Sequence, residues 1–407
     1  QHHPARTARQ QAEAEFERMF PDYLESLRPQ PVPLDELKAS LGPNEAVLLP
    51  LVMSERTVTL TVTRAGLTWD TDAHGWGRGT TRIRKLRESL DRSVADPEGR
   101  DLFDYDLAYG AYRSIFTPKI ERALRGIRHL TVPTDGAFSS LPPGVLITAP
   151  RRAGRTPDFL IRKYAVSVRS SFDRQRAGPT ASQATLRFAG IGDPTLGPAG
   201  PVGPALRSGK IDLQNLRDLP SLASAQQELG AMSRAFGSNS LLLTGARATE
   251  PMVRGTDLSG YGVVAFATHG LVSGEISGLR EPALVLTPPP SAPSTPNAED
   301  DGLLTAAEIA QLNLAADWVI LSACNTSAGG NGGLRYSGLA RAFRLAGARS
   351  LLLSHWAVRD DVAARLTVRT VQLSAKGVDR AEALRRAQVE LIDDRRVPGA
   401  DHPAVWA

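Results

Sequence analysis

A short apolar run at residues 319–321 gives way within a few positions to small, polar and then glycine-rich sequence. The run, Val-Ile-Leu, is typical of a strand that is buried on both faces of a sheet. Residues 322–326 are small or polar, and glycine dominates residues 329–333. Apolar residues then recur at helical spacing over 339–346, and Ser337 stands where it could cap that helix. This order predicts one unit of an open α/β sheet, in which ligands bind at the carboxyl ends of the strands.

The same alternation of strands and helices fills most of the chain. Besides the run above, strands are predicted at residues 47–53, 57–63, 129–133, 160–170, 187–191, 240–243, 263–267 and 350–354. Helices are predicted at residues 8–28, 80–94, 105–125, 223–236, 304–312, 337–347, 359–375 and 379–394, and a further helix begins at residue 249. Strands that alternate with helices favour an α/β fold with a mostly parallel sheet flanked by helices.

The alternating pattern runs through the chain twice, with a polar, small-residue stretch at 173–185 between the two passes. We therefore predict an N-terminal helix and linker at residues 1–33, a first α/β subdomain at 34–175 and a second at 186–407. The N-terminal helix could be the end of a helical module that lies upstream.

The composition argues against several classes of function. The net charge of +5 over 407 residues is a mild excess without a concentrated basic stripe, so we expect no direct binding to nucleic acid. A single cysteine cannot form an internal disulfide, and no apolar run is long enough to cross a membrane. Since no signal-peptide pattern is present either, we expect a cytoplasmic protein that does not bind membranes.

Two consecutive predicted strands of the second half end in residues that can do chemistry. One leads to His269 and the next to Cys324, which lies 324 − 269 = 55 residues later. A thiolate is a nucleophile, and a neighbouring imidazole can take its proton or stabilise it as an ion pair. Gly270 leaves a backbone N–H open to a substrate oxygen, so the N–H groups of Gly270 and Cys324 are candidates for an oxyanion hole. Either residue alone would be read as structural, but together they favour catalysis.

Other chemistries fit the sequence less well. No Gly-x-Ser-x-Gly elbow is present, and the glycines at 329–333 lack the lysine of a phosphate-binding loop. One cysteine and scattered histidines form no metal-ligand cluster. We therefore predict neither a metal nor another cofactor.

Several segments carry a resemblance to a known family. They are Ala-Thr-His-Gly at 267–270, Ser-Ala-Cys-Asn-Thr at 322–326, the helix sequence at 338–343, Trp-Ala-Val-Arg-Asp at 356–360, and the upstream segment at 132–136. With these segments the chain resembles the CHAT family, caspase-like cysteine peptidases that occur with tetratricopeptide repeats and are related to separase. The spacing of histidine and cysteine also agrees with that of caspases.

The resemblance implies roles for particular residues. Cys324 would be the nucleophile and His269 its base or ion-pair partner, with the oxyanion bound by the N–H groups of Gly270 and Cys324. The first subdomain would be a non-catalytic pseudo-caspase unit. Asp360 matches the separase residue that lines the pocket for a basic side chain before the cut. A capping role for Asp360 at the next helix is an equal alternative.

Asp301 is a second candidate for the pocket, with a turn residue as the alternative. The leading hypothesis is thus a cysteine endopeptidase that cuts a specific protein partner after a basic residue. A sensor, upstream or separate and similar to tetratricopeptide repeats, would activate it. A catalytically silent scaffold that binds a protein partner, and a different cysteine acyl-transfer enzyme such as an amidase, stay open as alternatives.

Overall fold

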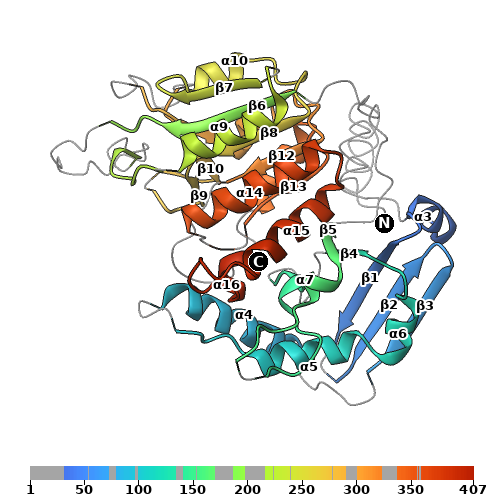
Figure 1. Cartoon of the computed structure of the whole chain (residues 1–407). Helices are drawn as coiled ribbons and strands as arrows, with labels where there is room; N and C mark the ends of the chain where they lie inside the picture. Colours follow the sequence, from blue (N-terminus) through green and yellow to red (C-terminus); the bar gives the residue numbers. More distant parts are fainter. Residues whose placement is uncertain are drawn as a thin grey trace, which may run out of the picture.

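The computed structural model describes residues 32–53, 55–72, 79–96, 100–133, 141–152, 154–169, 187–197, 216–222, 224–238, 240–276, 278–289, 300–322, 337–354, 356 and 359–407. Two five-stranded sheets and one three-stranded sheet occur in these ranges. Figure 1 shows the two larger sheets in separate halves, with helix α15 (Arg380–Ile392) between them. The predicted α/β class is confirmed.

The first sheet has the order β3-β2-β1-β4-β5. Strands β1, β2 and β3 form an antiparallel meander, and β4 and β5 continue the sheet in parallel with β1. Its strands are β1 (Glu45–Val52), β2 (Thr57–Thr63), β3 (Gly66–Thr71), β4 (His129–Pro133) and β5 (Ala165–Arg169). The helices of this half are α3 (Leu34–Ser40), α4 (Gly79–Ala95), α5 (Tyr105–Ile115), α6 (Pro118–Ala123) and α7 (Leu160–Lys163), with a 3₁₀ turn at Pro143–Val145.

The second large sheet is parallel throughout and has the order β13-β12-β8-β6-β7. Its strands are β6 (Phe188–Pro194), β7 (Ser240–Gly245), β8 (Val263–Ala267), β12 (Trp318–Leu321) and β13 (Leu351–Leu352). The helices that follow them are α9 (Ala225–Phe236), α10 (Glu250–Gly255), α11 (Ala306–Ile309), α13 (Ser337–Leu345) and α14 (Asp360–Ala375). Every residue of β8 and β12 is buried, because helices cover both faces of this sheet.

The two faces of the second sheet pack against different helices. Val263 and Ala265 of β8 lie in one core cluster with residues of α9 and α14. Val264 and Phe266 point the other way and pack with residues of α10, α11 and α13. Figure 1 shows α9 and α14 side by side on the same face. The alternation of side chains along a strand thus tells which helices each residue meets.

A small antiparallel sheet lies beyond the end of β8. It consists of β9 (Gly270–Leu271), β10 (Ala283–Val285) and β11 (Leu303–Thr305), in the order β11-β10-β9. The sequence pattern predicts none of these strands, since two or three residues are too few to show a period. The helix predicted from 304 begins only at Ala306, because Leu303–Thr305 pairs with β10 and Thr305 caps α11 with Glu308 in a capping box.

Other element predictions are corrected by local chemistry. The helix predicted at 105–125 is two helices, because Pro118 starts a new one that Thr117 caps. The strand predicted at 160–170 begins with a helical turn, α7, and becomes a strand only at Ala165. The helix predicted at 8–28 and the linker at 173–185 lie outside the described residues.

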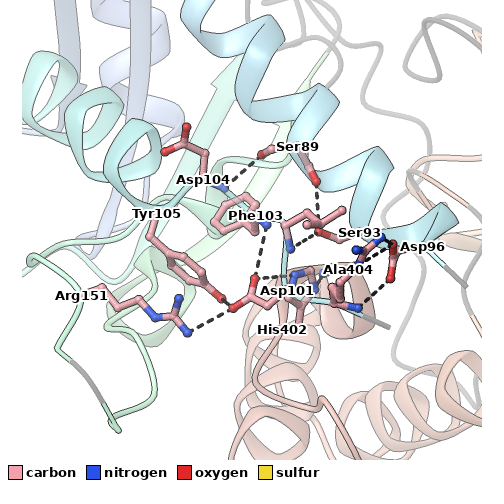
Figure 2. A network of polar contacts seen from close by, with 12 residues as sticks. Ser89, Ser93, Asp96, Asp101, Phe103, Asp104, Tyr105, Arg151, His402 and Ala404 are labelled. Carbon is pink, nitrogen blue, oxygen red and sulfur yellow. Dashed lines mark hydrogen bonds and ion pairs between the residues drawn. The ribbon is translucent and has the colours of Figure 1, made fainter. Parts of the chain in front are cut away.

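The C-terminal end of the chain returns to the first half. Trp406, in α16 (Pro403–Trp406), belongs to the same core cluster as Phe159 and Leu391. Figure 2 shows polar contacts at the start of α16: His402 Nε2 lies 3.1 Å from Asp101 Oδ1, and His402 Nδ1 accepts from the N–H of Ala404. The division into subdomains at 34–175 and 186–407 stays a prediction, but the described core of the first half includes residues from the C-terminal helices.

Candidate active site

The strands that precede His269 and Cys324 are neighbours in the second sheet. β12 pairs in parallel with β8, and the partners run from Trp318 opposite Val263 to Leu321 opposite Phe266. The N–H of Ser322 continues this ladder and donates to the carbonyl of Phe266 at 2.8 Å. The carboxyl ends of both strands therefore lie next to each other at the same end of the sheet, as the sequence predicts.

His269 lies two residues after the end of β8. Its side chain is buried, with the residue 2% exposed, and Nε2 lies 2.7 Å from the carbonyl oxygen of Pro220. A carbonyl can only accept, so Nε2 carries the proton in this contact. In the neutral ring Nδ1 then has a free lone pair, and this buried atom has no hydrogen-bond partner among the described residues. The neutral ring in this contact is thus the tautomer that a base needs, and no described residue bonds its accepting nitrogen.

Sequence reasoning missed the role of Pro220. Its carbonyl fixes both the orientation and the tautomer of His269. Pro220 lies 49 positions before His269 and shortly before α9. A backbone carbonyl has no side-chain signature, so no pattern in the sequence could have identified it.

The N–H of Gly270 is directed away from its strand partner. Gly270 lies opposite Leu284 in the β9–β10 pair, and the neighbouring Val285 donates its N–H to the carbonyl of His269 at 2.9 Å. Hydrogen-bonded and non-hydrogen-bonded pairs alternate along an antiparallel ladder. Gly270 and Leu284 therefore form a non-hydrogen-bonded pair, which leaves the glycine N–H outside the ladder.

Asp301 is engaged in contacts of its own. Its Oδ1 accepts from the N–H of Leu303 at 2.9 Å, and its N–H donates to Glu250 Oε2 at 3.1 Å. Burial raises the pKa of Asp301 to about 6. The contacts of Asp301 are with this turn and with Glu250 of α10, and no contact between described residues joins Asp301 to His269.

Two predicted site residues lie partly or wholly outside the described residues. Cys324 belongs to the stretch after Ser322 that the structure does not describe. Asp360 is the first residue of α14, but its side chain is not described. Because α14 begins at Asp360 with Arg359 in the cap position, Asp360 is not the capping residue that the alternative interpretation expects.

Two features are absent from the described residues, a metal-binding cluster and a membrane-spanning helix. No group of three or more histidine, cysteine, aspartate or glutamate side chains is arranged there to hold a metal ion. Within the same ranges, every helix is too short or too polar to span a membrane.

The candidate site thus lies at the carboxyl ends of parallel strands in an α/β protein and includes a histidine whose ring is oriented by a backbone carbonyl. The sequence model of the CHAT domain matches residues 106–407. This match spans most of the chain, and the protein belongs to the CHAT domain family, as the sequence motifs indicate.

Comparisons with individual proteins add less. No curated protein matches the chain. Among solved structures, the crystal structure of the Arg-specific cysteine proteinase gingipain R is similar over 80% of this chain and 74% of that chain, with a TM-score of 0.42 and 7% sequence identity.

Proposed function

We propose that the protein is a cysteine endopeptidase in which Cys324 is the nucleophile and His269 its general base. The observation that carries this proposal is the strand register. β12 and β8 pair with an offset of 318 − 263 = 55, which equals the separation 324 − 269 of the two residues. Cys324 and His269 therefore stand the same number of positions beyond the last paired residues, Leu321 and Phe266, at the ends of strands that lie roughly 5 Å apart.

The side-chain alternation supports the same arrangement. Trp318 and Ile320 face α9 and α14, as do Val263 and Ala265. Cys324 and His269 each follow these residues by an even number of positions, and such a separation favours the same face for both residues. A thiol and an imidazole that follow neighbouring strands on one face of a sheet are in reach of proton transfer.

The geometry of His269 accounts for each proton in the reaction. Nδ1 takes the proton of the Cys324 thiol, and the thiolate attacks the carbonyl carbon of the scissile peptide. The N–H groups of Gly270 and Cys324 stabilise the oxyanion that forms. His269 then gives the proton to the leaving amine. Nδ1 next deprotonates a water that attacks the acyl-enzyme, and the imidazolium returns this proton to the departing Cys324 thiolate. Throughout, Pro220 holds the Nε2 proton in place.

We further propose that Asp360 forms the pocket for a basic side chain before the cut. The family resemblance supports this role, and the position of Asp360 at the start of α14 agrees with it, since α14 covers the same sheet face as α9. A carboxylate recognises arginine or lysine through charge-assisted hydrogen bonds. Asp301 is the weaker candidate because its carboxylate is already bound within its turn.

The substrate is a protein partner, and the family resemblance supports activation by a sensor module. We test the proposal with a library of peptides that differ in the residue before the cut. Cys324→Ala and His269→Ala should lower cleavage by about 10³-fold or more, because each removes one member of a unit that acts together. His129→Ala is the matched control, since His129 lies in the first sheet and bonds Ser167.

Three outcomes decide between the hypotheses. Cleavage retained in Cys324→Ala would rule out the nucleophile assignment. A wild-type protein that binds a partner but neither cleaves peptides nor reacts with a peptidyl electrophile would favour the silent scaffold. A preference for arginine that survives Asp360→Ala would show that another residue forms the pocket.

A further inference from the structure

A buried glutamate joins three elements beneath the candidate site. Glu228 lies in α9 and is 5% exposed. Its Oε2 accepts from the hydroxyl of Ser322 at 3.0 Å, and its Oε1 accepts from the hydroxyl of Thr367 in α14. One carboxylate therefore connects the end of β12, α9 and α14.

The contact with Ser322 lies next to the candidate nucleophile. Ser322 is the first residue after β12, and Cys324 follows two positions later. The backbone of Ser322 is fixed to β8 by its N–H, and its side chain is fixed to α9 by Glu228. These two bonds together fix Ser322, the last described residue before Cys324.

The same stretch of chain also holds the histidine. Pro220, whose carbonyl accepts from His269, precedes α9 by a few residues, and Glu228 lies in the first turn of that helix. Glu228 belongs to the regular helix, since its N–H donates to the carbonyl of Ser224, the N-cap residue of α9. Pro220 and Glu228 thus contact the residues that follow the two strands leading to the proposed catalytic pair.

We propose that Glu228 is a positioning residue, which sets the thiol of Cys324 against Nδ1 of His269 by holding Ser322. This inference rests on the proposed function, because it presumes that thiol and imidazole act as a pair. A carboxylate suits the role because its two oxygens accept from two hydroxyls at once, whereas a glutamine amide has one oxygen to accept. Without the bond to Glu228, the exit of β12 loses its side-chain anchor.

The chain contains one cysteine, so thiol alkylation reports on Cys324 alone. We would measure the rate of reaction with iodoacetamide from pH 4 to pH 10, a readout that needs no peptide substrate and follows the thiolate fraction. Ser322→Ala should move the midpoint of the curve of alkylation rate against pH upward, toward about 8.5, which is the pKa of an unpaired thiol. His269→Ala should move this midpoint in the same direction. A rise of about one pH unit lowers the rate below the midpoint roughly tenfold.

Two variants separate positioning from loss of stability. Ser322→Thr keeps the hydroxyl and should retain the wild-type profile. Ser89→Ala removes a buried serine hydroxyl in the first half, where it bonds Leu86 and Asp104, and should lower thermal stability without moving the profile. A loss of stability alone would therefore not mimic the expected shift.

The role of Glu228 itself is tested by a double-mutant cycle. Ser322→Ala made in a Glu228→Gln background should add little further shift, because the hydroxyl acts through the carboxylate. An equal shift in both backgrounds would show that Ser322 acts independently and would overturn the proposal.

The two proposals fail in distinguishable ways. If His269→Ala moves the alkylation profile and Ser322→Ala does not, the catalytic pair stands and the positioning role is wrong. If His269→Ala leaves the profile unchanged, no thiol–imidazole pair exists, and the proposed function and this inference are both overturned.

Discussion

At the scale of single residues, burial decides what a carboxyl group can do. Glu250 of α10 is 1% exposed and lies against Glu308, with Arg254 3.4 Å from both carboxyl groups. Burial first, and then hydrogen bonding to Glu308 and repulsion by its charge, raise the pKa of Glu250 to about 9. At neutral pH the pair therefore keeps a proton, and Arg254 balances the remaining charge.

This raised pKa predicts how stability depends on pH. Above about pH 4.5 the unfolded chain releases the proton that the folded protein keeps, so the stability contributed by Glu250 falls as the pH rises toward 9. We expect Tm to fall between pH 6 and pH 9 in the wild type, and to fall less in Glu250→Gln, which cannot ionise. The same series of scans on Glu55→Gln, an exposed site, should follow the wild type. Parallel curves for all three proteins would contradict this explanation.

Individual site residues differ in how far the sequence predicts them. The positions of His269 and Gly270 follow from local patterns, a buried strand that ends in a polar residue and a glycine. Pro220 and Glu228 act through a carbonyl and through contacts with Ser322 and Thr367, which lie 94 and 139 positions away from Glu228. Contacts over such separations leave no local pattern, so the sequence alone does not indicate them.

At the scale of elements, the end of β8 is shaped by its neighbour β6. Gly192 lies opposite Ala267, two residues before His269, and has a φ of +156°. A Cβ atom at Gly192 would come within 2.0 Å of the carbonyl oxygen of Ala267. Because Gly192 has no side chain, β6 and β8 can approach each other closely at their carboxyl ends, where the candidate site lies.

Gly192→Ala should consequently be destabilising, because the clash is with backbone and cannot be relieved by a rotamer change. We expect a loss at or above the upper end of the roughly 1–3 kcal/mol seen for overpacked sites, measured by denaturant unfolding. Gly230→Ala is the matched control in α9, where the added methyl group meets no atom closer than 3.6 Å. It should stabilise the helix by about 0.5–1 kcal/mol. Equal effects at the two positions would contradict the steric argument.

Element predictions succeed where a segment carries a full period. The run at 57–63 and the buried run at 263–267 are observed as β2 and β8 with unchanged bounds. They fail where an element is only two or three residues long, as in the sheet of β9, β10 and β11. These short strands form because they pair with one another. Pairing between distant segments overrides local preference in such places.

At the scale of the whole molecule, the C-terminus closes the core of the first half. Trp406 is 1% exposed and packs edge-on against Phe159, with ring centroids 4.8 Å apart. Gln388 of α15 donates to the carbonyl of Trp406 at 3.0 Å. The last residues of the chain are thus part of a core built mainly by residues before 170.

Trp406→Ala should therefore destabilise the protein by about 3–5 kcal/mol, the range for removing a large aromatic side chain from a core. The measurement is denaturant unfolding of the full chain, followed by circular dichroism. Trp69→Ala removes the same side chain at a site that is 56% exposed and should change stability by about 0.5 kcal/mol or less. A small effect at Trp406 would mean that the C-terminal helix does not contribute to this core.

The sequence by itself determined the α/β class, the family, and the two strands that lead to His269 and Cys324. These features follow from periodicity, from short motifs and from residue spacing, which are all local properties of the chain. Only the tertiary structure decided that Pro220 orients the imidazole, that Glu228 holds the exit of β12, and that Trp406 completes the core of the first half. The physical reason is that each of these contacts joins segments far apart in the chain, and folding alone brings them together.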